Sequence, residues 1–465
     1  MGPQIIPGGE RTIAAVSTPP GSGGVAMIRV SGSDALDIFS RIWKGTDPGS
    51  FDSHTAHLGW ITDRDGREID QVVALLYKSP NSYTGEDVVE ITCHGSPWIQ
   101  KAIVTRLIES GASAAGPGEF TRRAFLNGRL DLAQAEGVAD MIASTSEASA
   151  RLAASQLKGD FSKKLKGLRD KLIDLGSLLE LELDFSEEDV EFADRSSLTL
   201  LGEEILQIIG RLADSFRSGN AFKNGIPVAI SGIPNAGKST LLNALTGEDK
   251  AIVSDIPGTT RDVIEDTVEI GGILFRFYDT AGLRESDDVI ESIGVEKARK
   301  KMAEAFILLR LLDPTKPLAP QLDTFKSSME DTEHKPIILN VLTKKDLNPK
   351  LGEEWQKIQE EEDTVTISAA TGEGLDELKD RLKQLATRDF NPEQELVVTN
   401  ARHYEALCSA KAPLMRMMEG LSQGLSADFL AQDLREAGHY LGAITGEVTS
   451  DNILHTIFAR YCIGK

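Results

Sequence analysis

The sequence predicts a multidomain protein: an α+β domain at the N-terminus, an all-α helical domain, and an α/β domain inserted into the helical one. Two observations predict this fold class. The 465 residues are too many for one hydrophobic core, and the apolar spacing changes along the chain from strand-like to helix-like and back. The expected parts are residues 1–127 for the α+β domain, 128–220 and 388–465 for the helical domain, and 221–387 for the insertion.

The N-terminal part alternates strand-like and helix-like stretches. Its strand-like runs are short, rich in branched residues and separated by Gly and Pro. These runs are Thr12–Ser17, Val25–Val30, Gln71–Tyr77 and Val88–Thr92, and the helix-like stretches are Ala35–Ile42 and Ile99–Ser110. The alternation predicts a compact α+β domain that ends near Asn127.

The helical domain is predicted from leucines three and four residues apart, which form one stripe on a helix. The first stripe is Leu165, Leu168, Leu172, Leu175 and Leu179, and helix-like spacing resumes over Ser197–Phe216. After a break at Asn391-Pro392, further stripes are Leu407, Leu414, Met418 and Leu421, then Phe429, Leu430, Leu434 and Leu441. We expect these side chains to form a core. The two blocks predict one interrupted domain, with two separate helical pieces as the alternative.

The inserted domain contains a phosphate-binding loop. Residues 232–239, Gly-Ile-Pro-Asn-Ala-Gly-Lys-Ser, match the pattern G-x-x-x-x-G-K-[S/T]. The strand-like run Ile226–Ile230 precedes the loop and the helix-like run Ser239–Leu245 follows it, which disfavours a chance match in a turn. Backbone N–H groups of such a loop surround phosphates. Lys238 would reach the β- and γ-phosphates and Ser239 would hold Mg²⁺, and the other nucleotide contacts would be Asn235, Ala236, Gly237 and Thr240.

Three later motifs predict that the nucleotide is GTP. They are Asp279-Thr280-Ala281-Gly282, Thr343-Lys344-Lys345-Asp346 and Ser368-Ala369-Ala370. The first two follow strand-like runs, and the third resembles the loop that closes over the base. The first is the GTPase motif that supports Mg²⁺ and senses the γ-phosphate. In the second, Asp346 accepts from the two N–H groups that guanine has and adenine lacks, Lys344 packs over the base, and Thr343 replaces the usual Asn. Together the motifs predict a Ras-like P-loop GTPase domain.

The residues that drive hydrolysis are less conventional. Leu283 stands where many GTPases have a water-orienting Gln. The segment Ser254–Asp262 resembles the first switch of potassium-activated GTPases, with Thr260 on Mg²⁺ and with Ser254, Thr259 and Thr260 near GTP. This resemblance implies a K⁺ site formed by Asn235, Ser254, Ile256 and Thr259. Asn235 alone is also a common turn residue, so the assignment depends on its combination with the switch.

A water-positioning carboxylate is expected in the second switch. Its candidates are Glu285, Asp287, Asp288 and Glu291. A solvated acidic surface explains most of these residues equally well, and the residues themselves do not select one of the four.

Composition narrows the class of protein. The formal net charge is −22 and the isoelectric point is about 4.8, which makes the whole chain a poor electrostatic match for nucleic acid. Three cysteines are too few and too scattered for a disulfide framework or a metal cluster. A signal peptide and an apolar run of about 18 residues are both lacking. We therefore expect a soluble cytoplasmic protein without membrane partners.

Long motifs outside the inserted domain are specific to one family. They are Thr18–Val25, Tyr83–Asp87, Cys93–Gly95, Pro117–Gly128, Asp131–Glu136 and the terminal Cys462-Ile463-Gly464-Lys465. Through these motifs the chain resembles the MnmE family, also called TrmE, from about residue 10 to its last residue. The terminal C-x-G-K pattern is part of that resemblance.

The resemblance implies a function in tRNA modification. It implies a GTP-hydrolysing component of a complex that adds an aminomethyl-type group (carboxymethylaminomethyl or aminomethyl) to C5 of the wobble uridine. The carbon would come from a reduced folate, 5-formyl- or 5,10-methylene-tetrahydrofolate. The implied partners are a second copy of the chain, bound through the N-terminal domain, tRNA, and an FAD-dependent MnmG-type protein in a heterotetramer or larger complex. GTP and K⁺ would drive dimerisation of the GTPase domains.

The resemblance also implies individual site residues. Among the acidic candidates it points to Glu291, acting on the attacking water through a bridging water. Arg29, Arg129 and Lys465 would meet the anionic tail of the folate, and Glu90 would accept from its pterin. Cys462 would act as a nucleophile or acid/base in one-carbon transfer. The alternatives are solvated charges for the arginines, an outward-facing strand residue for Glu90, and a small buried side chain for Cys462.

Two other functions fit parts of the sequence. A regulatory GTPase of ribosome assembly usually carries a basic RNA-binding module, and the acidic flanks here argue against one. An interaction scaffold whose nucleotide only sets its shape is not excluded by the sequence. The run Arg122, Arg123 and Arg129 is the one modest basic candidate for a tRNA contact near the folate motifs.

Overall fold

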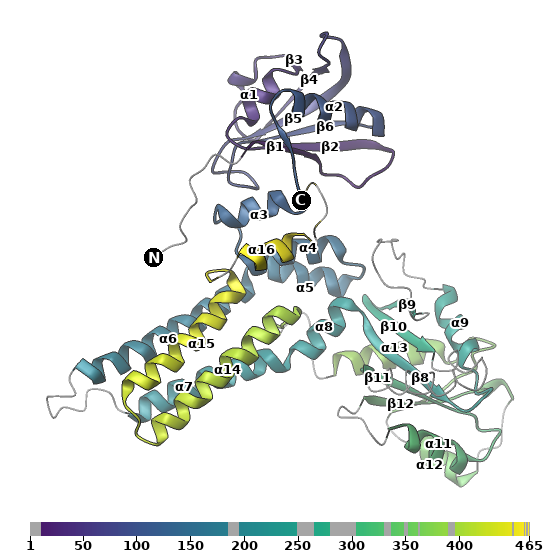
Figure 1. The fold of residues 1–465 in the computed structure, drawn as a ribbon. Coiled ribbons are helices and arrows are strands. Elements are labelled where there is room, and N and C mark those ends of the chain that lie inside the picture. The colour runs from purple at the N-terminus through teal and green to yellow at the C-terminus, as the bar shows by residue number, and fades with distance from the viewer. Residues whose placement is uncertain are drawn as a thin grey trace, which may run out of the picture. The chain divides into compact units, whose positions relative to one another are not determined.

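The protein is described by a computed structural model (Figure 1). The described residues are 11–184, 195–248, 265–279, 304–329, 336–347, 352–360, 363–388, 396–448, 451–459, 461 and 464. The chain divides into two compact units. One contains Met1–Ala139, Gln156–Ile173 and Leu434–Lys465, and the other contains Asp140–Ser155 and Asp174–Asp433.

The first unit contains a seven-stranded sheet with the strand order β3-β4-β5-β6-β2-β1-β7. The strands are β1 (Ile13–Val16), β2 (Gly23–Ser31), β3 (Trp43–Lys44), β4 (Thr55–Thr62), β5 (Glu68–Tyr77), β6 (Val88–Gly95) and β7 (Ser113–Ala114). Helices α1 (Ala35–Ser40) and α2 (Pro97–Glu109) bury Phe39 and Leu107 in one core with the strand residues Ile28 and Ile91. The predicted strands and helices of this part are confirmed within two or three residues.

Strand β4 was not predicted from the sequence. It pairs along its whole length with β5, yet its sequence T-A-H-L-G-W-I-T contains Gly59 and few branched residues. A side chain at Gly59 would collide with the Trp43 ring at 2.3 Å. The glycine that weakens the strand pattern is therefore required by packing.

Short helices follow the sheet. They are α3 (Glu119–Leu126), α4 (Leu132–Ala143), α5 (Glu147–Leu157) and, at the C-terminal end, α16 (Asp451–Phe458). The Tyr461 hydroxyl donates to the Ala135 carbonyl at 2.6 Å, and the Ser17 hydroxyl donates to the Gly464 carbonyl at 2.9 Å. Tyr461 is thereby fixed to α4, and Gly464 is fixed to the residue that follows β1, near the N-terminal end of the sequence.

The predicted leucine stripes lie on long helices. These helices are α6 (Asp160–Asp184), α14 (Ala401–Ser422) and α15 (Ala427–Thr445), and the predicted stretch Ser197–Phe216 lies on α7 (Arg195–Asp214) and the start of the shorter α8 (Phe216–Asn224). The stripe residues are buried, with two exceptions. Phe429 is 64 % exposed, so its assignment to the core is wrong, and Met417 is buried more deeply than Met418. On α15 the buried face includes Leu430 and leaves its neighbour Phe429 outside, and on α14 it is displaced by one residue, from Met418 to Met417.

The α/β part contains a six-stranded sheet with the order β13-β12-β11-β8-β10-β9. Only β9 is antiparallel to its neighbour. The elements are β8 (Ile226–Gly232), α9 (Lys238–Glu248), β9 (Glu265–Ile270), β10 (Ile273–Asp279), β11 (Ile307–Leu312), α11 (Leu318–Met329), β12 (Ile337–Leu342), α12 (Glu353–Gln359), β13 (Thr364–Thr366) and α13 (Leu375–Thr387). In such sheets ligands bind beyond the carboxyl ends of the strands.

The predicted multidomain fold class is confirmed, because a mixed helix and sheet part, long helices and a P-loop α/β part are all present. Every helix in the described part of the chain is too short or too polar to cross a bilayer.

Candidate functional site

The phosphate-binding loop follows β8 and leads into α9, as the sequence predicts. Asn235 has a φ of 63° and Gly237 a φ of 98°, and the Ala236 side chain is fully buried. Left-handed residues next to a helix N-terminus turn backbone N–H groups toward one side, which produces an anion site. The Lys238 ammonium donates to the Gly232 carbonyl at 2.7 Å and to the Ile233 carbonyl at 3.1 Å, so it is held against the loop itself.

The loop also fits the ions that a nucleotide requires. Ser239 and Thr240 are exposed in the first turn of α9, and Asn235 is exposed within the loop. A hydroxyl at the helix start is a suitable Mg²⁺ ligand, and the Asn235 amide oxygen is a suitable ligand for a monovalent cation.

The residues predicted to recognise the base lie beyond β12 and β13. The Ser368 hydroxyl donates to Asp346 Oδ1 at 2.7 Å, and Ser368 is fully buried while Asp346 is exposed. Ala369 and Ala370 follow Ser368 at the turn after β13. The contact fixes one oxygen of the carboxylate and so orients the exposed group that the sequence assigns to guanine.

Lys344 is held by a residue that sequence reasoning missed. Its ammonium contacts Asp313 Oδ2 at 2.6 Å, and the Asp313 side chain is fully buried. Burial alone raises the pKa of the Asp313 carboxyl, but hydrogen bonds from Lys344 and Thr315 outweigh it, so the pKa lies below its ordinary value. Lys344 also has a φ of 60°. An ion pair and a left-handed backbone therefore both constrain this lysine.

Thr343 has a structural contact. It is 3 % exposed, and its N–H donates to the Leu312 carbonyl at 2.9 Å. Its hydroxyl lies 3.3 Å from the same carbonyl. Thr343 thus joins the ends of β11 and β12, which carry Asp313 and Lys344.

Several predicted residues lie outside the described part of the chain. Asp279 ends β10, but its side chain is not described. The others are Ser254, Ile256, Thr259, Thr260, Thr280, Ala281, Gly282, Glu291, Cys462 and Lys465. Their assignments stay predictions.

A second candidate site lies beside the N-terminal sheet. Its pocket of about 440 Å³ is lined by His54, Tyr77, Asn81, Ser82, Tyr83 and Arg129. Glu90 borders this group, because the Tyr77 hydroxyl lies 3.5 Å from Glu90 Oε2. Arg29 donates to Glu90 Oε1 from Nε at 2.9 Å and from Nη2 at 2.7 Å. Three of the four residues assigned to folate, Arg29, Glu90 and Arg129, therefore lie together.

The two arginines have different environments. Arg29 is 8 % exposed, and its guanidinium lies 5.0 Å from the ring centre of Tyr83 and 5.6 Å from that of Phe120. The alternative of a solvated surface charge is therefore wrong for Arg29, which holds Glu90 in place. Arg129 is exposed at the pocket, where it is accessible to an anion.

The pocket combines aromatic and polar groups. Burial raises the pKa of the Tyr83 hydroxyl, and burial together with the Glu90 charge raises that of Tyr77, so both remain neutral donors at physiological pH. An exposed cation, a carboxylate and two phenols suit a ligand with an aromatic ring, N–H donors and an anionic tail. The sequence did not point to His54, whose ring meets Tyr77 edge-on at 5.1 Å.

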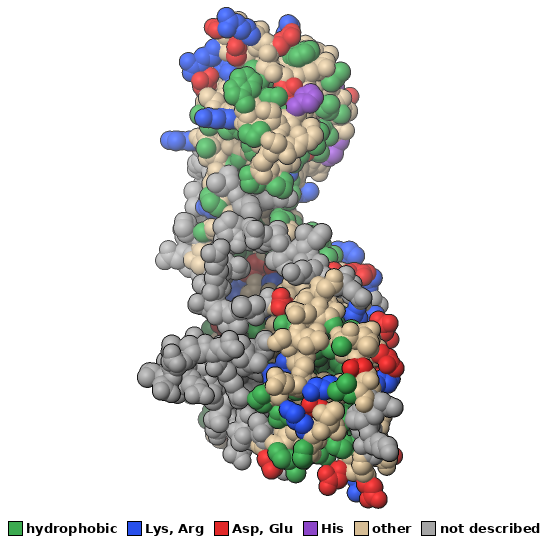
Figure 2. Space-filling model, turned by 90° about the vertical axis from the view of Figure 1, so that its right-hand side faces the viewer, with side chains coloured by type: hydrophobic (Ala, Val, Ile, Leu, Met, Phe, Trp, Pro, Cys, Tyr) green, Lys and Arg blue, Asp and Glu red, His purple; other side chains and the backbone are tan. Residues whose placement is uncertain are grey.

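The basic run near the folate motifs does not form a basic surface. Arg123 is 2 % exposed and is paired with Glu86 and Glu119, so its prediction as a tRNA contact is wrong. On the face drawn in Figure 2, the described Lys and Arg side chains are interspersed with Asp and Glu.

Two family models match the chain. One, described as "GTP-binding protein TrmE N-terminus", matches residues 12–129, and the other, "MnmE helical domain", matches residues 132–462. The chain belongs to the MnmE family. The curated MnmE relatives include the "tRNA modification GTPase MnmE" of Bacteroides fragilis, 49 % identical over 98 % of this chain and 100 % of its own length. The protein of the same name from Porphyromonas gingivalis is 50 % identical, over 98 % of both chains.

A solved structure is similar to part of this MnmE-family chain. It is the G domain of the T. maritima FeoB iron transporter, 27 % identical over 35 % of this chain and 99 % of its own, with a TM-score of 0.26. Independently of that structure, the strand order of the six-stranded sheet and the left-handed residues of the loop after β8 identify this part as a P-loop α/β domain. The chain is thus a member of a GTPase family with a P-loop α/β domain.

Proposed function

We propose that this chain is the GTP-hydrolysing component of a tRNA-modifying complex. The complex would add an aminomethyl-type group, carboxymethylaminomethyl or aminomethyl, to C5 of the wobble uridine. The observation that carries this proposal is the match to curated tRNA modification GTPases along the full chain. The two candidate sites would supply the nucleotide and the one-carbon parts of the function.

The nucleotide part is supported by the geometry around Asp346 and Lys344. The Ser368 hydroxyl orients the Asp346 carboxylate, and the Asp313 carboxylate holds the Lys344 ammonium. A fixed carboxylate prefers guanine because adenine lacks the adjacent pair of N–H donors that guanine offers, and unpaired polar groups cost affinity. The phosphate loop would bind the phosphates through its N–H groups and Lys238, and Ser239 and Thr260 would hold Mg²⁺.

Hydrolysis would depend on K⁺ and on Glu291. Asn235, with Ser254, Ile256 and Thr259, would hold a K⁺ ion that stabilises charge on the transferred phosphoryl group, the function of an arginine finger elsewhere. Glu291 would orient the attacking water. The exposed Asn235 side chain in the phosphate loop supports the K⁺ assignment.

The one-carbon part is supported by the pocket beside Glu90. A reduced folate has a pterin with N–H donors and a glutamate tail, and Glu90 and Arg129 offer the matching acceptor and cation. When bound, the folate would supply a carbon at the formaldehyde or formate oxidation level. Lys465 would add a second cation for the tail, and Cys462 would assist the transfer as a nucleophile or acid/base.

The protein would act as a homodimer with an FAD-dependent MnmG-type partner and tRNA in the cytoplasm. Val25 and Leu58 point from the same side of the N-terminal sheet, and they are 68 % and 66 % exposed. Contiguous exposed apolar patches mark interfaces, whereas single exposed apolar residues are ordinary, so these two side chains are compatible with dimerisation through this domain.

The experiment is an analysis of wobble-uridine nucleosides by mass spectrometry in tRNA from cells that lack this gene. We expect the C5-modified uridine to disappear and to return with the intact gene, but not with a gene that lacks Cys462–Lys465. An unchanged nucleoside profile would contradict the proposal and favour a regulatory GTPase of ribosome assembly.

A further inference from the structure

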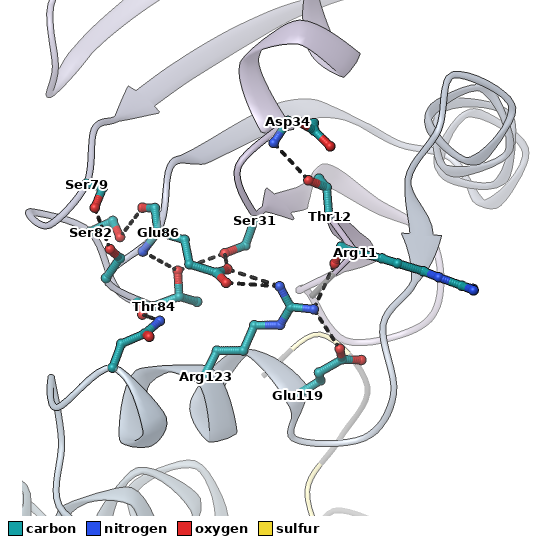
Figure 3. A network of polar contacts seen from close by, with 12 residues as sticks. Arg11, Thr12, Ser31, Asp34, Ser79, Ser82, Thr84, Glu86, Glu119 and Arg123 are labelled. Carbon is teal, nitrogen blue, oxygen red and sulfur yellow. Dashed lines mark hydrogen bonds and ion pairs between the residues drawn. The ribbon is translucent and has the colours of Figure 1, made fainter. Parts of the chain in front are cut away.

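One wall of the N-terminal pocket is the loop between β5 and β6, residues 78–87. Asn81, Ser82 and Tyr83 of this loop line the pocket. Behind them the loop is fixed by a network of polar contacts (Figure 3). The Ser82 hydroxyl donates to the Glu86 carbonyl at 2.6 Å, and the Thr84 hydroxyl lies 2.7 Å from that of Ser31, with both residues fully buried.

An ion pair inside the domain anchors this loop to α3. Arg123 Nη1 lies 3.1 Å and 3.2 Å from the two carboxylate oxygens of Glu86. Arg123 Nη2 donates to Glu119 at 2.9 Å and to the Arg11 carbonyl at 2.9 Å. Figure 3 shows the Glu86 and Arg123 side chains pointing toward one another between the loop and the helix. A charge this deeply buried requires its partners, because an uncompensated charge in the interior is strongly destabilising.

Two neutral hydrogen bonds join the same two segments. The Asn127 side chain donates to the Thr84 carbonyl at 2.8 Å, and the Tyr83 hydroxyl lies 2.9 Å from that of Thr121. Asn127 directly follows α3, and Arg129 comes two residues later. The helix therefore fixes both the loop wall and the exposed cation of the pocket.

We propose that Arg123 and Glu86 are positioning residues for the ligand of this pocket. Neither side chain lines the pocket, so they do not contact the ligand. Their ion pair sets the separation between Tyr83 on the loop and Arg129 after α3, and with it the affinity for a ligand that has an aromatic ring and an anionic tail. This inference rests on the proposed folate function of the pocket.

The test uses the full-length protein and the variants Glu86→Gln and Arg123→Lys. The matched control is Arg64→Gln, because Arg64 forms an exposed ion pair with Glu109 in the same domain, at 2.7 Å and far from the pocket network. Calorimetric titration with 5-formyltetrahydrofolate gives the affinity, and hydrogen exchange of residues 78–87 gives the order of the loop without any ligand.

We expect Glu86→Gln to weaken binding at least tenfold and to accelerate exchange in residues 78–87 and 119–129, with strands β2 and β6 still protected. Arg123→Lys keeps the charge but not the forked geometry, so it should retain part of the affinity that Glu86→Gln loses. Arg64→Gln should match the wild type in both measurements. If Glu86→Gln does not fold, Thr121→Val removes the neutral contact to Tyr83 and should accelerate exchange in the same loop.

Two results would overturn the inference. One is unchanged affinity and loop exchange in Glu86→Gln. The other is accelerated exchange through the whole sheet, which would make the ion pair a general folding contact. A wild-type protein that does not bind the probe would refute the folate function instead, and the exchange of residues 78–87 would still decide whether the ion pair orders the loop.

Discussion

The contact between Asp313 and Lys344 leads to a prediction about nucleotide affinity. Asp313→Asn keeps the size of a fully buried side chain and removes its charge. The Lys344 ammonium, now 2.6 Å from a carboxylate oxygen, would lose its charged acceptor. We expect weaker binding of GDP and GTP, because Lys344 would no longer be held where it packs against the base.

The magnitude can be worked from this geometry. A hydrogen bond to a charged group contributes about 1.5–3 kcal/mol, and the amide oxygen that replaces the carboxylate retains part of the contact to Thr315. If the whole loss is felt in the complex, the GDP dissociation constant rises roughly 10- to 150-fold. The matched control is Glu373→Gln, since Glu373 pairs with the adjacent Lys345 at 2.8 Å on the surface. An exposed pair of this kind contributes roughly 0–1 kcal/mol.

The lowered pKa of Asp313 also predicts how the free energy of unfolding of this variant, relative to the wild type, depends on pH. The pKa of Asp313 is below its ordinary value, so its stabilising contribution is complete above about pH 4 and is lost as the pH falls through the lowered pKa. The difference in unfolding free energy between wild type and Asp313→Asn should therefore be constant near neutral pH and shrink in acid. Equal GDP affinities in the wild type, Asp313→Asn and Glu373→Gln, measured by fluorescent nucleotide displacement, would refute the reasoning.

Four further predictions concern other residues. Asn235→Ala should remove the stimulation of GTP turnover by KCl over NaCl; equal wild-type rates in the two salts would contradict the K⁺ site. Glu291→Ala should bind GTP normally and lose turnover by about 10²-fold or more, whereas weaker binding with normal turnover would reject a role in positioning water. His54→Asn tolerates the φ of 65° and should weaken 5-formyltetrahydrofolate binding roughly tenfold, and unchanged affinity would remove His54 from the site. Burial raises the pKa of Cys93 to about 11, so iodoacetamide at pH 8 should alkylate the exposed Cys408 and spare Cys93 in the native protein, as peptide mass spectrometry would show.

The sequence predicted the parts of the fold that depend on local pattern. The strand β8, the phosphate loop and α9 are adjacent in the chain, and each has its own spacing and turn residues. The stripe on α6 was also correct, since Leu165 and Leu179 are both buried. Strand β4 was missed because its fit depends on Trp43, which lies outside the strand and requires Gly59.

The sequence proposed recognition groups, but it gave no signal for the residues that hold them. Arg29 is assigned to the folate site by resemblance, and the structure adds that it packs against the rings of Tyr83 and Phe120, which are more than fifty residues away in the sequence. Asp313 matches no motif, and its partner Lys344 lies 31 residues later. These contacts arise only when distant segments pack, so local spacing contains no signal for them.

At both candidate sites, a buried polar or charged side chain holds a more exposed charged group. At the end of the α/β part proposed to bind guanine, Ser368 and Asp313, both fully buried, fix Asp346 and Lys344, which are more exposed. In the N-terminal domain the buried Arg29 fixes Glu90 in the same manner. A group fixed before binding loses less conformational entropy in the complex, and this raises affinity without a new contact to the ligand. Substitution of a buried partner should therefore weaken binding at its own site while leaving every ligand-contacting side chain present, an effect that alignment of the contact motifs alone would not anticipate.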